Sequence, residues 1–368
     1  MRPERVAVLG AGNGGCAAAA DLARRGFEVR LFNRGPQRLA AIAERGGIEL
    51  VGALGEHYGA LALVTGDIRE ACADADVIML CVPTSAYDYY ARELATVAKQ
   101  GQPIFLNPGH VGGGLYLSHA IRRVNGRTDL LTCECTTLTY GCRMVEPTVV
   151  NVIQMPERVA FAAFPGRAQP ELFELARTLT PNIVEAGDVL ETAFLCINAV
   201  EHPPMIVLNA GWVEATAGDY LFYHDGTTPA VGRLIDRVDE ERLAVAGAAG
   251  IRTRPFVEYF CELGYTTERA VVERSGYVAL QESAVNRWVK GPRSLDGRYM
   301  HEDVGCGLVP LAAVGDVVGV ETPAMDALVA FASALNGVDY RTEGMTLDRL
   351  GLAGRPVEEW GAFVQDGL

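Results

Sequence analysis

Short apolar runs alternate with amphipathic segments through the first half of the chain. The pattern predicts strands at 5–9, 28–32, 61–65, 77–82, 103–106, 130–137, 148–154 and 158–164, and helices at 16–25, 68–73 and 85–99. The run at 77–82 is entirely apolar, as expected for a strand that is buried on both faces of a sheet. Strands that alternate with helices in this way predict a doubly wound parallel sheet.

The second half of the chain has a different pattern. From residue 190 onward the strand signals fade and long helical periods replace them. Thr228-Pro229 and Thr322-Pro323 each combine an N-cap threonine with a proline in the first turn, which predicts the start of a helix at both places. We therefore expect two domains: an α/β domain over 1–189 and a mainly α-helical domain over 190–368.

The composition is that of a globular protein and disfavours several partners. Of the 368 residues, 49% are apolar and 21% are charged, and the formal net charge is −14. Such an acidic surface disfavours nucleic acid and anionic membranes. No apolar run reaches the roughly 18 residues that a membrane span needs, and the first residues lack the pattern of a signal peptide. We therefore expect a cytoplasmic protein that binds neither nucleic acid nor membrane, and we leave open whether it forms a homodimer.

A glycine-rich turn follows the first predicted strand. Gly10, Gly12 and Gly15 occupy the glycine positions of the G-x-G-x-x-G pattern, with Asn13 and Gly14 between them. In dinucleotide-binding proteins these glycines provide a tight turn, close approach of the backbone to the pyrophosphate, and close packing of helix on sheet. The following helix N-terminus offers unpaired N–H groups to the phosphates. Because a strand precedes the pattern and a helix follows it, we expect a Rossmann-type domain that binds NADP or NAD.

The end of the second predicted strand distinguishes the two cofactors. An Asp or Glu at this point would bind the ribose 2′-hydroxyl of NAD, but this chain has Asn33 and Arg34. Arg34 can pair with the 2′-phosphate of NADP, so NADP is the preferred prediction. The alternative is that Arg34 stacks on the adenine or faces solvent, which leaves NAD open.

Two further strand ends are expected to border the cofactor. Val82 and Pro83 follow one buried strand and Asn107 follows the next, at the carboxyl edge of the sheet where ligands of such folds bind. The glycines at 112–114 then form either a place where the backbone approaches a ligand or a flexible loop.

Three cysteines raise the question of a metal site. Cys133 and Cys135 have a spacing that places both thiols on one face of a strand, and Cys142 follows nearby. No fourth ligand is evident close to them in the sequence. We interpret the three as packing or pocket residues and expect no metal.

Asn198 and His202 are the first candidates for chemistry in the second domain. They are four residues apart, so a helix places them on one face. Pro203 disfavours helical geometry at the preceding residue, so we expect the helix to kink or stop at His202. A histidine at a helix break can serve as a general acid–base group, with Asn198 beside it as a substrate contact. The alternative is a structural role, which is the more common one for a single histidine.

Several longer motifs follow in a fixed order. They are NAG at 209–211, FYHDGTTP at 222–229, DEERL at 239–243, RYMHEDV at 298–304 and GLVP at 307–310. This ordered set resembles the opine dehydrogenase family, which includes octopine and nopaline dehydrogenases. The resemblance extends from the glycine turn to about residue 330.

The resemblance implies a reaction. Members of the family join a 2-oxo acid such as pyruvate to the amino group of an amino acid, and they reduce the resulting imine with NADH or NADPH. It also implies that His202 pairs with Asp303 in catalysis and that Arg298 binds a substrate carboxylate. A histidine titrates near neutral pH, a carboxylate can fix its tautomer, and an arginine can grip a carboxylate with two hydrogen bonds.

The segment at 134–143 resembles the family segment that lines the substrate pocket. Thr137 and Cys142 are its expected substrate contacts. Asn33 and Arg34 depart from the acidic pattern of the NAD-preferring members. Nothing in the sequence selects the oxo acid or the amine.

Other functions remain as alternatives. Glycerol-3-phosphate dehydrogenases and ketopantoate reductases combine similar domains but generally use a lysine, and this chain has only Lys99 and Lys290, neither in a matching motif. A reductase of a simple 2-oxo acid that uses His202 and Asp303 without an amine is harder to exclude. A nucleotide sensor without activity is disfavoured because Arg298 accompanies both of these residues.

Overall fold

The computed structural model describes residues 3–367. Contacts divide the chain into two compact units. Of the described residues, the first unit contains 3–109, 113–189 and 363–367, and the second contains 110–112 and 190–362.

An eight-stranded sheet forms the centre of the first unit, in the strand order β12-β11-β8-β7-β6-β1-β2-β5. Its strands are β1 (Arg5–Leu9), β2 (Glu28–Phe32), β5 (Leu63–Thr65), β6 (Val77–Leu80), β7 (Pro103–Leu106), β8 (Leu131–Cys135), β11 (Val159–Phe164) and β12 (Ile183–Glu185). All neighbouring strands are parallel except β8 and β11. The doubly wound sheet predicted from the sequence is therefore confirmed, with β7 and β6 at its centre and β1 beside β6.

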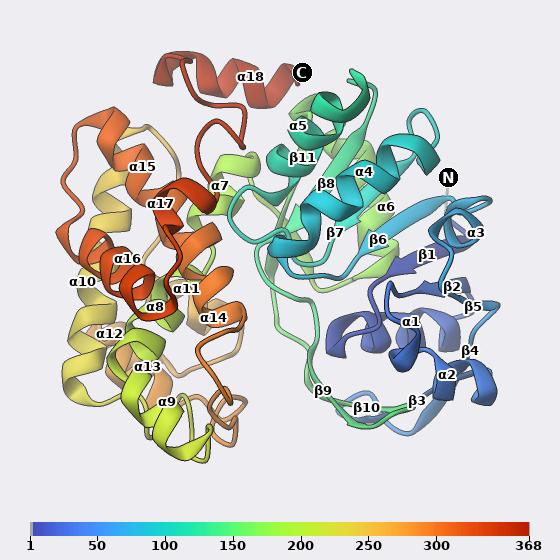
Figure 1. The fold of residues 1–368 in the computed structure, drawn as a ribbon, viewed down its shortest axis with the longest axis horizontal. Helices are drawn as coiled ribbons and strands as arrows, with labels where there is room; N and C mark the ends of the chain where they lie inside the picture. The colour runs from blue at the N-terminus through green and yellow to red at the C-terminus, as the bar shows by residue number, and fades with distance from the viewer. Residues whose placement is uncertain (1–2, 368) are drawn as a thin grey trace. The chain divides into compact units, whose positions relative to one another are not determined.

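Helices cover both faces of this sheet (Figure 1). They are α1 (Asn13–Arg24), α2 (Ala40–Arg45), α3 (Ile68–Cys72), α4 (Tyr87–Val97), α5 (Gly113–Asn125) and α6 (Gln169–Leu179), with 3₁₀ turns at η1 (Pro36–Arg38), η2 (Thr84–Ala86) and η3 (Gly166–Ala168). A hydrogen bond of 2.6 Å from Arg25 to the carbonyl of Leu179 joins the ends of α1 and α6. Helices α3, α4 and α5 contact one another in sequence. Right-handed crossovers place these two groups on opposite faces.

A second sheet of four strands was not predicted from the sequence. It has the order β4-β3-β10-β9 and consists of β3 (Gly47–Gly52), β4 (His57–Ala60), β9 (Gly141–Glu146) and β10 (Val149–Gln154). Its strands contact α1, and a Cβ at Gly59 would lie 2.7 Å from the backbone oxygen of Ala20. The small residues of α1 allow this close approach. Partial exposure gives β4 and β9 no clear apolar alternation, which explains the omission.

The second unit is helical, as predicted. It contains α7 (Val189–Phe194), α8 (Asn198–Leu208), α9 (Ala210–Thr216), α10 (Pro229–Ala248), α11 (Phe256–Glu262), α12 (Glu268–Glu273), α13 (Gly276–Gln281), α14 (Arg298–His301), the π-helix η4 (Val304–Leu308), α15 (Val309–Val318), α16 (Pro323–Asn336), α17 (Tyr340–Glu343), η5 (Val357–Glu359) and α18 (Trp360–Asp366). Both predicted threonine–proline helix starts are observed, at α10 and α16, and the Thr228 side chain accepts a hydrogen bond from the N–H of Val231.

Arg242 of α10 fixes the turn that leads into α8. The side chain is 2% exposed and donates to the carboxylate of Asp239, the carbonyl of Phe194 and the hydroxyl of Thr253. Because a buried guanidinium needs this set of acceptors, removal of any of them is costly. The hydrogen bond to the Phe194 carbonyl therefore ties α10 to the turn before α8, the helix that carries His202.

Two expectations need correction. Helix α8 does not stop at His202: it contains Pro203 and Pro204 and continues to Leu208. Burial of residues 199–207 against neighbouring helices offsets the N–H groups that the prolines lack. In addition, a single cut at 189/190 misses the C-terminal segment, where Phe363 packs against Phe164 of the first unit with ring centroids 5.6 Å apart.

Candidate active site

The glycine turn is tightly packed at Gly10 and Gly15 and open at Gly12. Gly10 has φ of +112°, and a Cβ there would lie 2.4 Å from the carbonyl oxygen of Cys81. A Cβ at Gly15 would lie 1.7 Å from the carbonyl oxygen of Gly10, so α1 packs on the turn only without a side chain. A Cβ at Gly12 would meet no atom within 4 Å. The first and third glycines thus serve packing, whereas the second borders open space where a phosphate can approach.

The N-terminus of α1 is suited to an anion. Gly12 is its N-cap and offers no side chain to the first N–H groups, and the first turn contains no acidic residue. The Asn13 side chain accepts a hydrogen bond of 3.0 Å from the N–H of Met144, so it fastens β9 to α1. A Cβ on Gly14 would lie 2.7 Å from the side chain of Leu138.

The end of β2 carries no carboxylate. The Asn33 amide accepts a hydrogen bond of 3.1 Å from the N–H of Ala11 and donates one of 2.9 Å to the carbonyl of Gly35, so it holds the glycine turn. Arg34 is exposed, and its guanidinium lies 5.2 Å from the ring centroid of Tyr89. This stacking orients a planar cation beside the turn.

The other two strand ends differ in their exposure. Val82 and Pro83 follow β6 and are partly or fully exposed. Asn107 follows β7 and is completely buried, with its amide bound to the N–H and the hydroxyl of Thr139 at 3.0 and 2.8 Å. Both groups of the Asn107 amide are thus engaged with the loop after β8. In the glycine run, Gly113 and Gly114 begin α5 and so do not form a flexible loop.

His202 and Asp303 lie in direct contact. Nδ1 of His202 is 2.8 Å from one oxygen of the Asp303 carboxylate, and both side chains are almost fully buried. Because an ionised carboxylate only accepts hydrogen bonds, Nδ1 carries the proton and donates it. Nε2 then accepts the hydroxyl of Tyr223 at 2.8 Å. His202 is therefore held in the tautomer that presents a basic nitrogen.

A second histidine binds the other oxygen of the same carboxylate, and the sequence interpretation missed it. Nε2 of His110 lies 2.9 Å from Asp303, and the ring is 2% exposed. His110 has φ of +60°, and Gly307 makes room for it, since a Cβ at Gly307 would be 3.3 Å from the His110 ring. A histidine directly after the strand-end turn Asn107-Pro108-Gly109 was the available signal.

The buried charges shift the acidities of all three groups. Burial opposes ionisation of Asp303, but His202 and His110 outweigh it and hold the pKa of Asp303 well below its usual range. Burial also opposes charge on His110, yet interactions with Cys196, Asp303 and Glu302 raise the pKa of His110 well above its ordinary value. Burial lowers the pKa of His202, and Asp303 offsets this only in part. The arrangement favours an ionised carboxylate between a charged His110 and a neutral His202.

Aromatic rings surround the imidazole of His202. Tyr299 and Tyr223 meet it edge-on, with centroids 4.7 and 5.8 Å away, and Phe222 stacks on Tyr299 at 4.4 Å. These rings restrict the histidine to one orientation and keep water from most of its surface. Asp303 immediately precedes the π-helix η4, a distortion that often accompanies functional residues.

Arg298 begins α14, five residues before Asp303. The residue is exposed as a whole, its guanidinium lies 5.4 Å from the ring centroid of Tyr299, and it forms no ion pair with any residue of 3–367. The planar fork is thus available for a ligand carboxylate.

The remaining predicted contacts are divided between the units. Asn198 is the first residue of α8 and is partly exposed, one turn before His202. Thr137 and Cys142 belong to the first unit and are buried. Burial raises the pKa of Cys142 to about 12, so its thiol is neutral at physiological pH.

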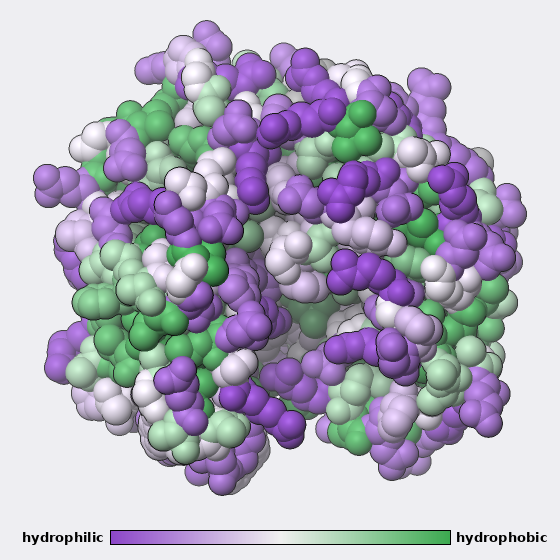
Figure 2. All heavy atoms as spheres, viewed as in Figure 1, coloured by the Kyte–Doolittle hydropathy of each residue, from purple (hydrophilic) through white to green (hydrophobic). Residues whose placement is uncertain are grey.

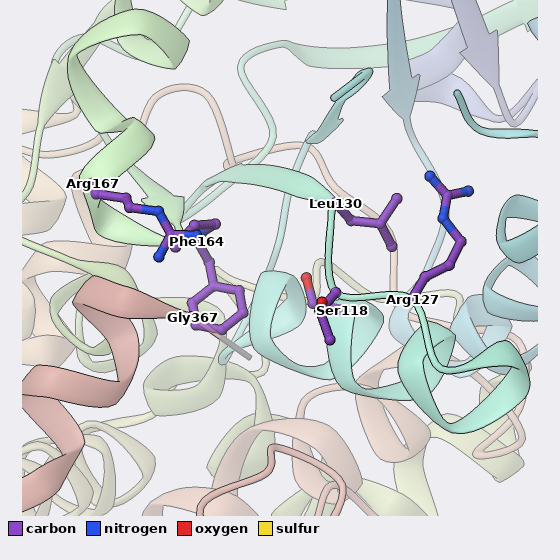
Figure 3. Close-up of a pocket in the computed structure, with 8 residues that line it drawn as sticks. Ser118, Arg127, Leu130, Phe164, Arg167 and Gly367 are labelled. Atoms are coloured by element: carbon purple, nitrogen blue, oxygen red, sulfur yellow. The ribbon is translucent and has the colours of Figure 1, made fainter. Parts of the chain in front are cut away.

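No group of three or more His, Cys, Asp or Glu side chains within residues 3–367 is arranged to hold a metal ion. A hollow in the first unit has none of the candidate site residues in its lining. Ser118, Phe164 and Gly367 line it between Arg127 and Arg167 (Figure 3). Arg127 is already paired with Asp129 at 2.8 Å, so the hollow offers no free cluster of charge.

Figure 2 shows a face covered mainly by polar residues, with apolar residues in scattered groups. No helix within residues 3–367 is long and apolar enough to cross a membrane.

Two family models match the chain. Residues 185–336 match the alpha-helical domain of NAD/NADP octopine/nopaline dehydrogenase, and residues 5–104 match NADP oxidoreductase coenzyme F420-dependent. An opine dehydrogenase of Arthrobacter sp. (strain 1C) is 37% identical over 350 residues, which cover 95% of both chains. The octopine dehydrogenase of Pecten maximus is 23% identical over 380 residues, which cover 92% of both chains.

Solved structures share the fold. An octopine dehydrogenase with NADH and L-arginine aligns with a TM-score of 0.77 and 20% identity, over 99% of this chain and 98% of that one. A yersinopine dehydrogenase with NADP+ bound aligns with a TM-score of 0.70 and 16% identity, over 100% of this chain and 98% of that one.

Proposed function

The chain belongs to the opine dehydrogenase family, and from this premise we propose that it condenses a 2-oxo acid with the amino group of an amino acid and reduces the imine with NAD(P)H. The observation that carries the proposal is the buried contact of 2.8 Å between His202 and Asp303, which leaves Nε2 of His202 basic. Reductive condensation needs such a base because an amino acid arrives as an ammonium ion that cannot attack a carbonyl.

The residues of the glycine turn fit a dinucleotide. The open space at Gly12 and the uncapped N-terminus of α1 would hold the pyrophosphate. Val82 and Pro83 would border the cofactor, whereas Asn13, Asn33 and Asn107 would act through the loops that they fasten. When bound, the nicotinamide supplies the hydride that reduces the imine carbon.

His202 has two tasks in this account. Nε2 takes a proton from the ammonium group, which frees the nitrogen lone pair for attack on the carbonyl carbon. The imidazolium then returns the proton to the carbonyl oxygen as that oxygen becomes a hydroxyl. A histidine with a lowered pKa is suited to both tasks, because it is neutral before the reaction and releases its proton readily afterwards.

Asp303 and His110 prepare His202 for these tasks. The Asp303 carboxylate orients the imidazole and stabilises the imidazolium when Nε2 gains a proton. His110 occupies the second oxygen of that carboxylate, so the carboxylate cannot rotate away from Nδ1. We assign His110 as a positioning residue, since it acts through Asp303.

Arg298 is the proposed partner of the substrate carboxylate. Its free planar fork can bind a carboxylate with two hydrogen bonds, and it precedes Asp303 by little more than one helical turn. Such a grip would orient the carbonyl carbon for attack and reduction. Asn198, Thr137 and Cys142 are proposed as further substrate contacts.

We propose a preference for NADPH over NADH. The end of β2 lacks the carboxylate that would bind a ribose 2′-hydroxyl, and Tyr89 orients the exposed Arg34 guanidinium. Both features favour a 2′-phosphate. A cytoplasmic location remains a prediction. Whether the protein forms a homodimer stays open, and light scattering would decide it.

One alternative, a 2-oxo acid reductase that needs no amine, would use the same acid–base pair. A lysine-dependent mechanism lacks a suitable residue, because Lys99 is exposed and Lys290 is paired on the surface with Asp219 at 2.7 Å.

The test of the proposed function is a spectrophotometric panel of NADPH and NADH with pyruvate, glyoxylate and 2-oxoglutarate, with and without amino acids. We expect cofactor oxidation to need both an oxo acid and an amine; equal rates without the amine would establish the simple reductase.

A further inference from the structure

Glu201 is a buried carboxyl group that the mechanism above does not use. It directly precedes His202 in α8 and is 2% exposed. Its Oε1 lies 3.4 Å from Nε2 of His202, on the basic side of the ring, and its Oε2 is buried without a hydrogen-bond partner. An ionised carboxylate in this position would have lost its hydration without compensation.

The surrounding charges favour the protonated, neutral form of the Glu201 carboxyl group. Burial and the nearby Asp303 carboxylate raise the pKa of Glu201 well above its ordinary value, and Arg298 opposes them only in part. The other groups that face this end of the site are His202, on the same helix, and the hydroxyl of Tyr223. Neither His202 nor Tyr223 supplies the positive charge that a buried carboxylate needs as its partner. Glu201 therefore holds a proton beside the atom at which protons are exchanged.

The condensation moves two protons. An ammonium ion and a carbonyl become an iminium ion and water, so both protons lost by the nitrogen end in the water. Nε2 of His202 can hold one proton at a time. After it has accepted the second proton from the nitrogen, the hydroxyl of the carbinolamine still needs a proton before it can leave.

We propose that Glu201 is the second proton carrier of the site and provides this proton; the proposal rests on the function proposed above. The C–O bond of the carbinolamine breaks, its oxygen takes the Glu201 proton and leaves as water, and the nitrogen lone pair forms the C=N bond. The imidazolium of His202 then returns its proton to the Glu201 carboxylate across the 3.4 Å contact. Both side chains regain their starting protonation, and no outside proton is consumed up to this point.

Infrared difference spectroscopy tests the starting state without substrate or cofactor. At neutral pH the wild type minus Glu201→Gln spectrum should contain the carbonyl stretch of a protonated carboxylic acid, which shifts in D₂O. Glu241→Gln is the matched control, because Glu241 is also buried but accepts hydrogen bonds from the N–H groups of Ala324 and Met325. It should show no such band. Absence of the band at Glu201 overturns the proposal even if the enzyme makes opines.

Kinetics test the transfer itself, with pyruvate and the amino acid that the substrate panel selects. Glu201→Gln should lower kcat about 10-fold or more with little change in KM or NADPH affinity, because His202 can still transfer protons singly. The wild-type rate should fall at high pH as Glu201 loses its proton. This alkaline limb of the pH profile should be absent in Glu201→Gln. Glu201→Asp, which retains a carboxyl group, should recover the limb.

Two kinetic results would overturn the role of Glu201. One is a Glu201→Gln variant with the wild-type kcat and pH profile, and the other is a Glu201→Asp variant that lacks the alkaline limb while it binds NADPH normally. Failure of the wild type to need an amine would instead refute the proposed function and leave the infrared result standing.

Discussion

His110 and His202 bind opposite oxygens of one carboxylate, at 2.9 and 2.8 Å from Asp303. They come from distant parts of the sequence, yet both belong to the second unit. The shared Asp303 couples them. The charge on one histidine affects the pKa of the other, because the contact is buried where the dielectric constant is low. Burial lowers the pKa of His202, and the proximity of His110 lowers it further.

His110→Asn should move the pH profile of the condensation. In the proposed mechanism His202 must be neutral to accept a proton, so the rate falls as the pH falls through its pKa. Removal of the charge on His110 raises the pKa of His202, so the acid limb of kcat/KM should shift to higher pH. The maximal rate should fall on the order of 10-fold, part of a usual acid–base contribution.

His301→Asn provides the matched control for this shift. The ring nitrogens of His301 are hydrogen-bonded to Asp296 and Tyr340, not to the Asp303 carboxylate. Its substitution should leave the acid limb in place. An unchanged acid limb in His110→Asn, with NADPH bound normally, would show that His110 does not act through the shared carboxylate.

Gly12→Val should abolish cofactor binding in a folded protein. The side chain would enter the open space beside the N-terminus of α1, where nothing lies within 4 Å of a Cβ, so it blocks the pyrophosphate without strain. The NADPH dissociation constant by calorimetry should rise about 100-fold or more, equivalent to about 2.7 kcal/mol. Gly247→Val on α10, also in open space, is the control. Unchanged affinity in Gly12→Val would place the cofactor elsewhere.

Cofactor choice should follow Arg34. Arg34→Asp removes the proposed phosphate partner and adds an acceptor for the ribose hydroxyl, so the ratio of kcat/KM for NADPH over NADH should fall about 10- to 100-fold, as expected for loss of a charged hydrogen bond. Tyr89→Leu should produce a smaller shift in the same direction, because it releases the stacked guanidinium. A wild type that uses NADH better than NADPH would refute the argument from the end of β2.

The sequence predicted the parts of the fold that local pattern determines. The core strands, the glycine turn and the threonine–proline helix starts all follow from short-range rules. Helix α8 did not, because tertiary burial overrides the effect of Pro203 on helix geometry. The sheet that contains β3 and β9 also escaped prediction, since its strands are partly exposed and pair across long separations.

The residues of the candidate site were also predicted only in part from the sequence. Motif order pointed to His202, Asp303 and Arg298, and the structure joins the first two directly. His110 lies 193 residues from Asp303 in the chain, so only the folded structure reveals their contact. Glu201 precedes a candidate residue in the sequence, but its significance comes from burial and a missing partner, which no sequence pattern records.

The central claim is that His202 and Asp303 act as one acid–base unit in an amine-dependent reduction. The most direct test is a double-mutant cycle on kcat, with NADPH, pyruvate and the selected amino acid. His202→Ala should lower kcat on the order of 100- to 10,000-fold, and Asp303→Asn somewhat less. The double variant should be scarcely worse than His202→Ala, with NADPH affinity near native in all three. Losses that multiply in the double variant, or near-native turnover in His202→Ala, would contradict the account.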